Sequence, residues 1–218
     1  MRLLLLLLLL PAFASAHPMS RDQWSLRHAM KLDAGGLTAV VVLEIPDQMV
    51  VDELKAAEAI AQAGVQAGTD KRSPSELRRD LVDAQRKEQW KLLGRGVSLT
   101  VNGKPVDVAF TPHDTPANGR AMSGFFLYIV SVKLPADHPA LAGETVAAVL
   151  QDDAYPVPPM VFSALVKGGD DWLPTFDSST AVFGDDRGSG LPDDPRSWSD
   201  DKSLRRLEAK WKRAAPAK

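Results

Sequence analysis

A two-residue turn between two alternating segments places the firmest constraint on how this chain can fold. Hydrophobic and polar residues alternate over residues 97–101 and again over 106–110, with Asn102 and Gly103 between the two segments. Asparagine and glycine tolerate the positive φ angles of a type I′ turn, whose twist suits two antiparallel strands. Each strand would have one hydrophobic face, which a lone hairpin cannot shield from water. The sequence therefore predicts further strands that cover this hairpin.

Five more segments have the pattern of strands. They show alternation or an enrichment in β-branched and aromatic residues, and turn-forming residues bound them. These segments are residues 24–32, 37–45, 125–134, 144–150 and 160–166. Together with the two arms of the hairpin they make seven strands, a number typical of an immunoglobulin-like sandwich. The predicted fold class is therefore mainly β, an immunoglobulin-like antiparallel β-sandwich.

A helical pattern interrupts the predicted strands between the second and the third. Residues 52–67 are rich in alanine and contain no proline. Ser73, Pro74 and Glu76 then form a helix start, in which serine caps, proline fits the first turn and glutamate reaches back. This second helix is predicted to end at Gly94. We therefore expect an inserted α-helical hairpin at about residues 52–93.

Residues 1–16 have the pattern of a secretory signal peptide. Arg2 precedes eight leucines, and Ala14 and Ala16 supply the small residues of a cleavage site. The leucine run is too short to span a bilayer permanently, and no later segment is hydrophobic enough to do so. We expect cleavage after Ala16, with a cut two residues earlier as the alternative. The mature protein is then periplasmic or secreted.

Composition excludes several classes of function. The chain has no cysteine, which rules out disulfides, thiolate metal sites and lipidation at a cleaved cysteine. Its net charge of −2 argues against general nucleic-acid binding. The sequence contains no nucleophile elbow, phosphate-binding loop or HExxH motif, so the chain is not predicted to be an enzyme.

The last part of the chain is predicted to lie outside the sandwich domain, which is expected to span residues 17–176. Aspartates dominate residues 177–201, and basic residues dominate 202–218. Leu204, Leu207 and Trp211 recur at helical spacing. These patterns predict that residues 177–218 form a flexible acidic linker followed by a short basic amphipathic helix. Because its hydrophobic face is small, we expect no stable membrane insertion.

Four short segments carry a resemblance to a known family. They are residues 16–18 (Ala-His-Pro), 42–46 (Val-Leu-Glu-Ile-Pro), 90–94 (Trp-Lys-Leu-Leu-Gly) and 99–106 (Leu-Thr-Val-Asn-Gly-Lys-Pro-Val). In this order they are similar to the extracytoplasmic N-terminal region of bacterial nickel/cobalt transporters, a group that includes the hydrogenase- and urease-associated permeases. The resemblance spans roughly residues 16–166. The membrane helices of that family have no counterpart here, so the resemblance implies an independent accessory or sensing domain.

Three histidines are candidate metal ligands. A mature N-terminal His17 would offer its α-amine and its ring nitrogen to Cu(II) or Ni(II). A histidine-brace site needs a second histidine close by, and either His28 on the first strand or His113 in a polar loop could supply it. The alternative is that His17 is a free chain end and that His28 is a hydrogen-bonded core residue.

Aspartate pairs are weaker candidates for cation sites. They occur at 152–153, 170–171, 185–186 and 193–194, without the regular spacing of a calcium loop. A solvated surface explains them best. Asp152, Asp153 and Tyr155 carry slightly more weight, because rigid prolines follow them at a sandwich end where loops gather.

These observations predict an exported accessory or binding protein. Its favoured ligand is a nickel, cobalt or copper ion, and its expected partner is a membrane transporter or another envelope protein. A histidine-brace copper enzyme and a purely structural protein-interaction domain are the alternatives.

Overall fold

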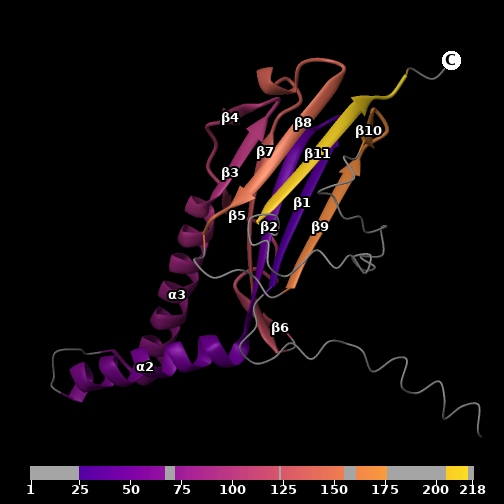
Figure 1. Cartoon of the computed structure of the whole chain (residues 1–218). Helices are drawn as coiled ribbons and strands as arrows, with labels where there is room; N and C mark the ends of the chain where they lie inside the picture. Colours follow the sequence, from indigo (N-terminus) through magenta and orange to yellow (C-terminus); the bar gives the residue numbers. More distant parts are fainter. Residues whose placement is uncertain (1–24, 67–71, 123, 155–160, 176–204, 216–218) are drawn as a thin grey trace, which may run out of the picture.

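Two β-sheets pack face to face in this chain, as Figure 1 shows. The computed structural model describes residues 25–66, 72–122, 124–154, 161–175 and 205–215. The first sheet has the strand order β5–β7–β2–β1–β9, with β6 also paired to β7, and the second has the order β10–β11–β8–β3–β4. The predicted β-sandwich is therefore confirmed. Its immunoglobulin-like strand order stays a prediction.

The strands of the two sheets differ greatly in length. The first sheet contains β1 (Ser25–Asp33), β2 (Gly36–Pro46), β5 (Thr111–Pro112), β6 (Arg120–Met122), β7 (Phe125–Leu134) and β9 (Val161–Gly168). The second contains β3 (Val97–Val101), β4 (Lys104–Val106), β8 (Thr145–Asp152), β10 (Trp172–Thr175) and β11 (Arg206–Arg213). Strands β1 and β9 run parallel, and the other described pairs are antiparallel.

Alternation along the strands builds a single hydrophobic core between the sheets. On β1, residues 26, 28, 30 and 32 are all 1% exposed, whereas Arg27 and Lys31 face solvent. On β8, Val146, Ala148 and Leu150 point inward in the same way. This matches the period of two expected for a strand with one buried face.

The predicted hairpin is present, although its second arm is shorter than expected. Asn102 and Gly103 have φ angles of 50° and 75°, and Val101 pairs with Lys104 across them, as a type I′ turn requires. Strand β4 ends at Val106 instead of continuing to residue 110. The chain leaves the sheet there, and Phe110 lies in the core with 6% exposure.

The inserted helical hairpin is also confirmed, with longer helices than predicted. Helix α2 spans Asp47–Gln66 and helix α3 spans Pro74–Gly96. The capping box of α3 is formed, because Glu76 N donates to Ser73 Oγ and Ser73 N donates to Glu76 Oε2. The expected end at Gly94 is wrong. A Cβ at Gly94 would lie 2.7 Å from the carbonyl oxygen of Phe110, so the missing side chain allows close packing and does not end the helix.

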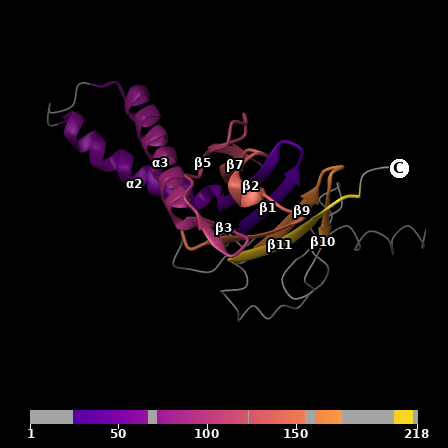
Figure 2. The same ribbon diagram turned by 90° about the horizontal axis from the view of Figure 1, so that it is seen from above.

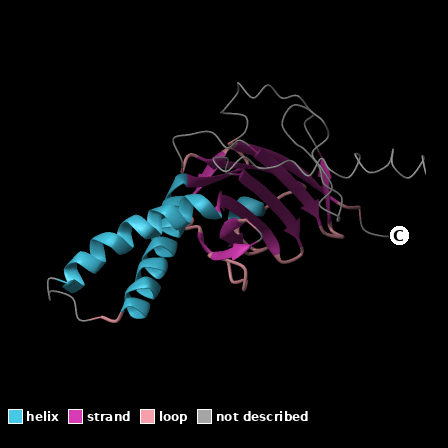
Figure 3. Cartoon of the chain, turned by 90° about the horizontal axis from the view of Figure 1, so that it is seen from below, coloured by secondary structure: helices cyan, strands magenta, loops and turns pink. Residues whose placement is uncertain are grey.

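The hairpin extends away from one end of the sandwich. Figure 1 shows α2 lying at a steep angle across the lower part of α3, and Figures 2 and 3 show the far ends of both helices remote from both sheets. Within the described part of the chain, neither helix is long and hydrophobic enough to cross a membrane.

The predicted C-terminal amphipathic helix is wrong, because this segment forms strand β11. It lies between β8 and β10 in the second sheet, as Figure 1 shows. Leu207, Ala209 and Trp211 are buried and alternate with charged residues, which is the period of a strand. The four-residue spacing of Leu207 and Trp211 fits either a helix or a strand. The burial of Ala209 between them fits only the strand.

The position of β11 also changes the predicted domain boundary. The sandwich does not end at residue 176, since residues 206–213 form part of its second sheet. The predicted signal peptide (1–16) and acidic linker (177–201) lie outside the described residues.

Candidate functional site

A histidine and an aspartate meet between the two sheets. His28 comes from β1 and Asp152 from the last position of β8, and both continue the inward-facing pattern of their strands. Nε2 of His28 lies 3.9 Å from Oδ2 of Asp152, and the two side chains are 0% and 2% exposed. The sequence pointed to both residues separately, and the fold brings them together.

The surroundings of Asp152 hold its carboxylate in place. Its Oδ1 accepts a 2.8 Å hydrogen bond from the backbone N–H of Ala154, and its own N–H donates to the carbonyl of Arg205. Arg205 is itself only 6% exposed. Three residues that can carry charge, His28, Asp152 and Arg205, are thus buried at the end of the sandwich where α3 enters β3.

This buried group is suited to joining the sheets and poorly suited to catalysis. The contact between His28 and Asp152 links β1 of one sheet to β8 of the other. A substrate could not reach side chains with this little exposure without a structural change. We therefore treat the pair as a structural contact.

The other candidate histidines lie elsewhere. His113 is exposed, and its Nδ1 is 2.9 Å from Oγ of Ser131. Ser131 pairs with Val40, whereas His28 pairs with Val41, so the two histidines belong to opposite faces of the first sheet. The structure therefore does not bring His28 and His113 together. His17 lies outside the described residues.

His138 and Asp153 each have another hydrogen-bond partner. His138 accepts a hydrogen bond from Ala140 N and so caps the 3₁₀ helix η2 (Pro139–Leu141). Asp153 is exposed and accepts from Gln151. Across the described ranges, no three histidine or acidic side chains gather in a geometry that could hold a metal ion. Tyr155 and the aspartate pairs 185–186 and 193–194 are not among the described residues.

Sequence reasoning missed the polar contacts that fasten α3 to the first sheet. The indole N–H of Trp90 donates to Oδ1 of Asn118 at 2.8 Å, and the hydroxyl of Tyr128 donates to Oε1 of Gln85 at 2.7 Å. A Cβ at Gly119 would lie 2.7 Å from the ring of Trp90, so glycine lets the indole pack closely. The sequence signal that could have indicated this contact was the Asn118-Gly119 dipeptide, because asparagine followed by glycine favours turns.

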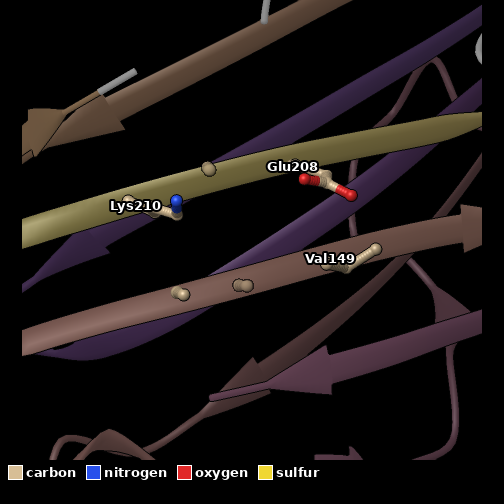
Figure 4. Close-up of a pocket in the computed structure, with 6 residues that line it drawn as sticks. Val149, Glu208 and Lys210 are labelled. Atoms are coloured by element: carbon tan, nitrogen blue, oxygen red, sulfur yellow. The ribbon is translucent and has the colours of Figure 1, made fainter. Parts of the chain in front are cut away.

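A shallow depression lies on the outer face of the second sheet. Figure 4 shows Val149 on β8 beside Glu208 and Lys210 on β11, which line it together with Ala147. Its volume is about 40 Å³, enough for little more than a water molecule. It is too small for a ligand-binding site.

No protein-family model, curated protein or solved structure matches this chain.

Proposed function

We propose that this protein is an exported, non-catalytic accessory module that presents its α2–α3 hairpin to a partner protein of the cell envelope. The observation that carries the proposal is the extension of the hairpin away from the sandwich. Among the described residues, none between 57 and 81 belongs to the core between the sheets, so that core does not depend on the far part of the hairpin.

Burial within the hairpin supports a binding role. After Val50, the described side chains of α2 are exposed or half-buried, and before Leu93 the only buried residue of α3 is Leu77. Helices of 20 and 23 residues therefore bury few side chains against the rest of the molecule. Met49 and Leu92 are 39% and 40% exposed, which gives the base of the hairpin hydrophobic contact area for a partner.

The attachment of the hairpin fixes the second half of α3 on the sandwich. Trp90 and Gln85 bond to Asn118 and Tyr128 at the sandwich, and Leu93 is fully buried in the core. A surface held in position before binding loses less conformational entropy when it meets its partner.

The sequence supports the compartment and the kind of partner. The leader pattern of residues 1–16 favours export, and the resemblance to the extracytoplasmic region of nickel/cobalt transporters favours a role beside a membrane transporter. Metal binding is the part of this proposal that depends on His17. Nickel and copper titrations of the cleaved protein and of His17→Ala test it, and unchanged affinity in the variant would remove metal from the proposal.

Site-specific photocrosslinking in the producing cells tests the hairpin. A photoreactive amino acid is placed at Ala56 or Lys87, both exposed on the hairpin, and at Lys104 or Asp137 as exposed controls on the sandwich. We expect both hairpin positions to yield the same crosslinked envelope protein, and the controls to yield none. Equal labelling from all four positions, or none from the hairpin, contradicts the proposal.

A further inference from the structure

A second, larger depression lies between the two sheets at the end of the sandwich opposite the hairpin. Its volume is about 270 Å³, and the turn between β1 and β2 faces the start of β10 and the end of β11 across it. Three core residues, Leu32, Leu141 and Trp172, lie beneath it, and because they are at most 5% exposed they offer a ligand little hydrophobic surface. Three charged residues, Asp33, Asp171 and Arg213, lie around them.

The guanidinium group of Arg213 is positioned by Trp172. Arg213 and Trp172 are directly paired across β10 and β11, and Cζ of the arginine lies 4.8 Å from the centre of the indole ring. This distance is that of a cation–π contact. Arg213 forms no ion pair within the described part of the chain, so its N–H groups can donate to an anion in the depression.

Asp171 provides a negative charge beside Arg213. The backbone N–H of Ala214 donates to the carbonyl of Asp171 at 2.9 Å, which places residues 171 and 213 next to each other. The carboxylate of Asp171 makes no hydrogen bond or ion pair with the described residues. Both residues line the depression, and no ion pair joins their side chains.

Asp33 on the facing wall is already engaged. Its carboxylate binds Lys31 Nζ at 2.6 Å and accepts from Gly35 N at 2.8 Å. The hydrogen bond from Lys31 lowers the pKa of Asp33, and the Gly35 N–H acts in the same direction. Asp33 therefore stays ionised and paired, which leaves Asp171 as the carboxylate open to a ligand.

We infer that this depression binds a small free α-amino acid. Such a molecule carries a carboxylate for Arg213 and an ammonium group for Asp171, two charged residues that line the depression without pairing with each other. Its side chain would point toward solvent, because the residues beneath the depression expose little surface. Drug-sized ligands occupy pockets of about 300–1,000 Å³, so 270 Å³ fits a smaller molecule of this kind.

Calorimetric titration of the purified protein with three related probes tests the inference. L-leucine carries both charges, L-leucinamide lacks the carboxylate, and 4-methylpentanoate lacks the amine. Because a hydrogen bond to a charged group is worth about a tenfold change in affinity or more, we expect both analogues to bind at least that much more weakly than leucine.

Two variants assign each charge to its partner. Arg213→Gln should weaken leucine and 4-methylpentanoate but leave leucinamide unchanged, and Asp171→Asn should weaken leucine and leucinamide but leave 4-methylpentanoate unchanged. Lys212→Gln and Asp170→Asn are matched controls on neighbouring exposed residues, and they should bind all three probes like the unmodified protein.

Each other outcome overturns the inference. Absence of binding by leucine, valine and phenylalanine at millimolar concentration excludes an amino-acid site. Equal affinity for the three leucine probes excludes recognition of the two charges, and equal weakening by the control variants excludes this depression as the site. An unchanged thermal midpoint of each variant shows that it remains folded.

Discussion

The side chain of Asn118 connects three separate parts of the molecule. Its Oδ1 accepts from the indole N–H of Trp90 and from the backbone N–H of Ile129, at 2.8 and 2.7 Å. Its Nδ2 donates to the carbonyls of Ile129 and His113, at 2.8 and 2.9 Å. One residue thereby links α3, β7 and the segment that follows β5.

We expect Asn118→Ala to lower the free energy of unfolding by about 2 kcal/mol, because it leaves half-buried donors and acceptors without partners. Urea unfolding measures this change. Asn118→Asp keeps the acceptor but sets a carboxylate oxygen against the carbonyls of His113 and Ile129, so it should destabilise the protein at least as much as the alanine variant does. A loss below about 0.5 kcal/mol, usual for surface substitutions, would show that water replaces these bonds.

Tyr128 gives the molecule a pH dependence in alkaline solution. Burial raises the pKa of its phenol to about 12. An unfolded chain releases this proton near pH 10, the ordinary value of about 10 for tyrosine. Between these values the folded state binds more protons than the unfolded state, so stability falls as pH rises.

Urea midpoints measured from pH 9 to beyond pH 11 test this linkage. Tyr128→Phe cannot ionise, and we expect its midpoint to fall less steeply with pH than that of the unmodified protein. Identical slopes for the two proteins would show that Tyr128 does not titrate differently in the folded state.

The residue patterns predicted the burial of side chains better than they predicted contacts between side chains. The alternation on β1 correctly placed His28 on the same face as Leu26 and Met30. Its contact with Asp152 joins strands from different sheets, and no local pattern encodes the pairing of residues so far apart in sequence. Asn118 was missed for the same reason, since its partners belong to α3 and β7.

Strand β11 shows how a short element can be misread. Residues 207 and 211 are four apart, a spacing shared by one turn of helix and one face of a strand. Pairing with β8 selects the strand over the helix, because Leu207 pairs with Leu150 and Trp211 pairs with Val146. Such a partner is available only in the folded molecule, whereas the longer strands β1, β2 and β7 were recognisable from their own alternation.

The placement of β11 makes Trp211 a central core residue. It is 0% exposed, and its indole N–H donates to the carbonyl of Lys167 at 2.8 Å. We expect Trp211→Ala to reduce the free energy of unfolding by about 3–5 kcal/mol. Lys212→Ala, on the exposed side of the same strand, should change it by less than about 0.5 kcal/mol. Equal effects in chemical denaturation would contradict the burial of this strand.

At the scale of the whole molecule, the hairpin and the sandwich have separate roles in stability. Removing residues 57–81 and joining the helices through a short glycine turn should leave the unfolding midpoint nearly unchanged, since the sandwich core is untouched. Leu93→Ala should instead cost about 2–5 kcal/mol, because Leu93 is fully buried where α3 meets that core. Circular dichroism at increasing urea compares the two variants. A large loss from the shortened hairpin would show that its far end supports the sheets.

The sequence predicted that two helices interrupt the strands, and it did not predict where they point. Their direction depends on tertiary contacts at their base, where Trp90 bonds to Asn118 and Gln85 to Tyr128. The depression beside Trp172 was likewise hidden, because its walls come from both sheets. Local sequence patterns predict helices and strands, whereas a depression between two sheets forms only when those elements pack together.

The central position of β11 has a consequence for synthesis and transport. The second sheet cannot close until residues 206–213 have left the ribosome, because β8 and β10 both pair with this strand. A nascent chain that still lacks this strand therefore keeps its second sheet incomplete. Translocation machinery that threads an extended polypeptide would therefore receive this chain in an incompletely folded state that it can transport. For a chain exported as proposed here, the order of its strands would delay folding until after the membrane has been crossed.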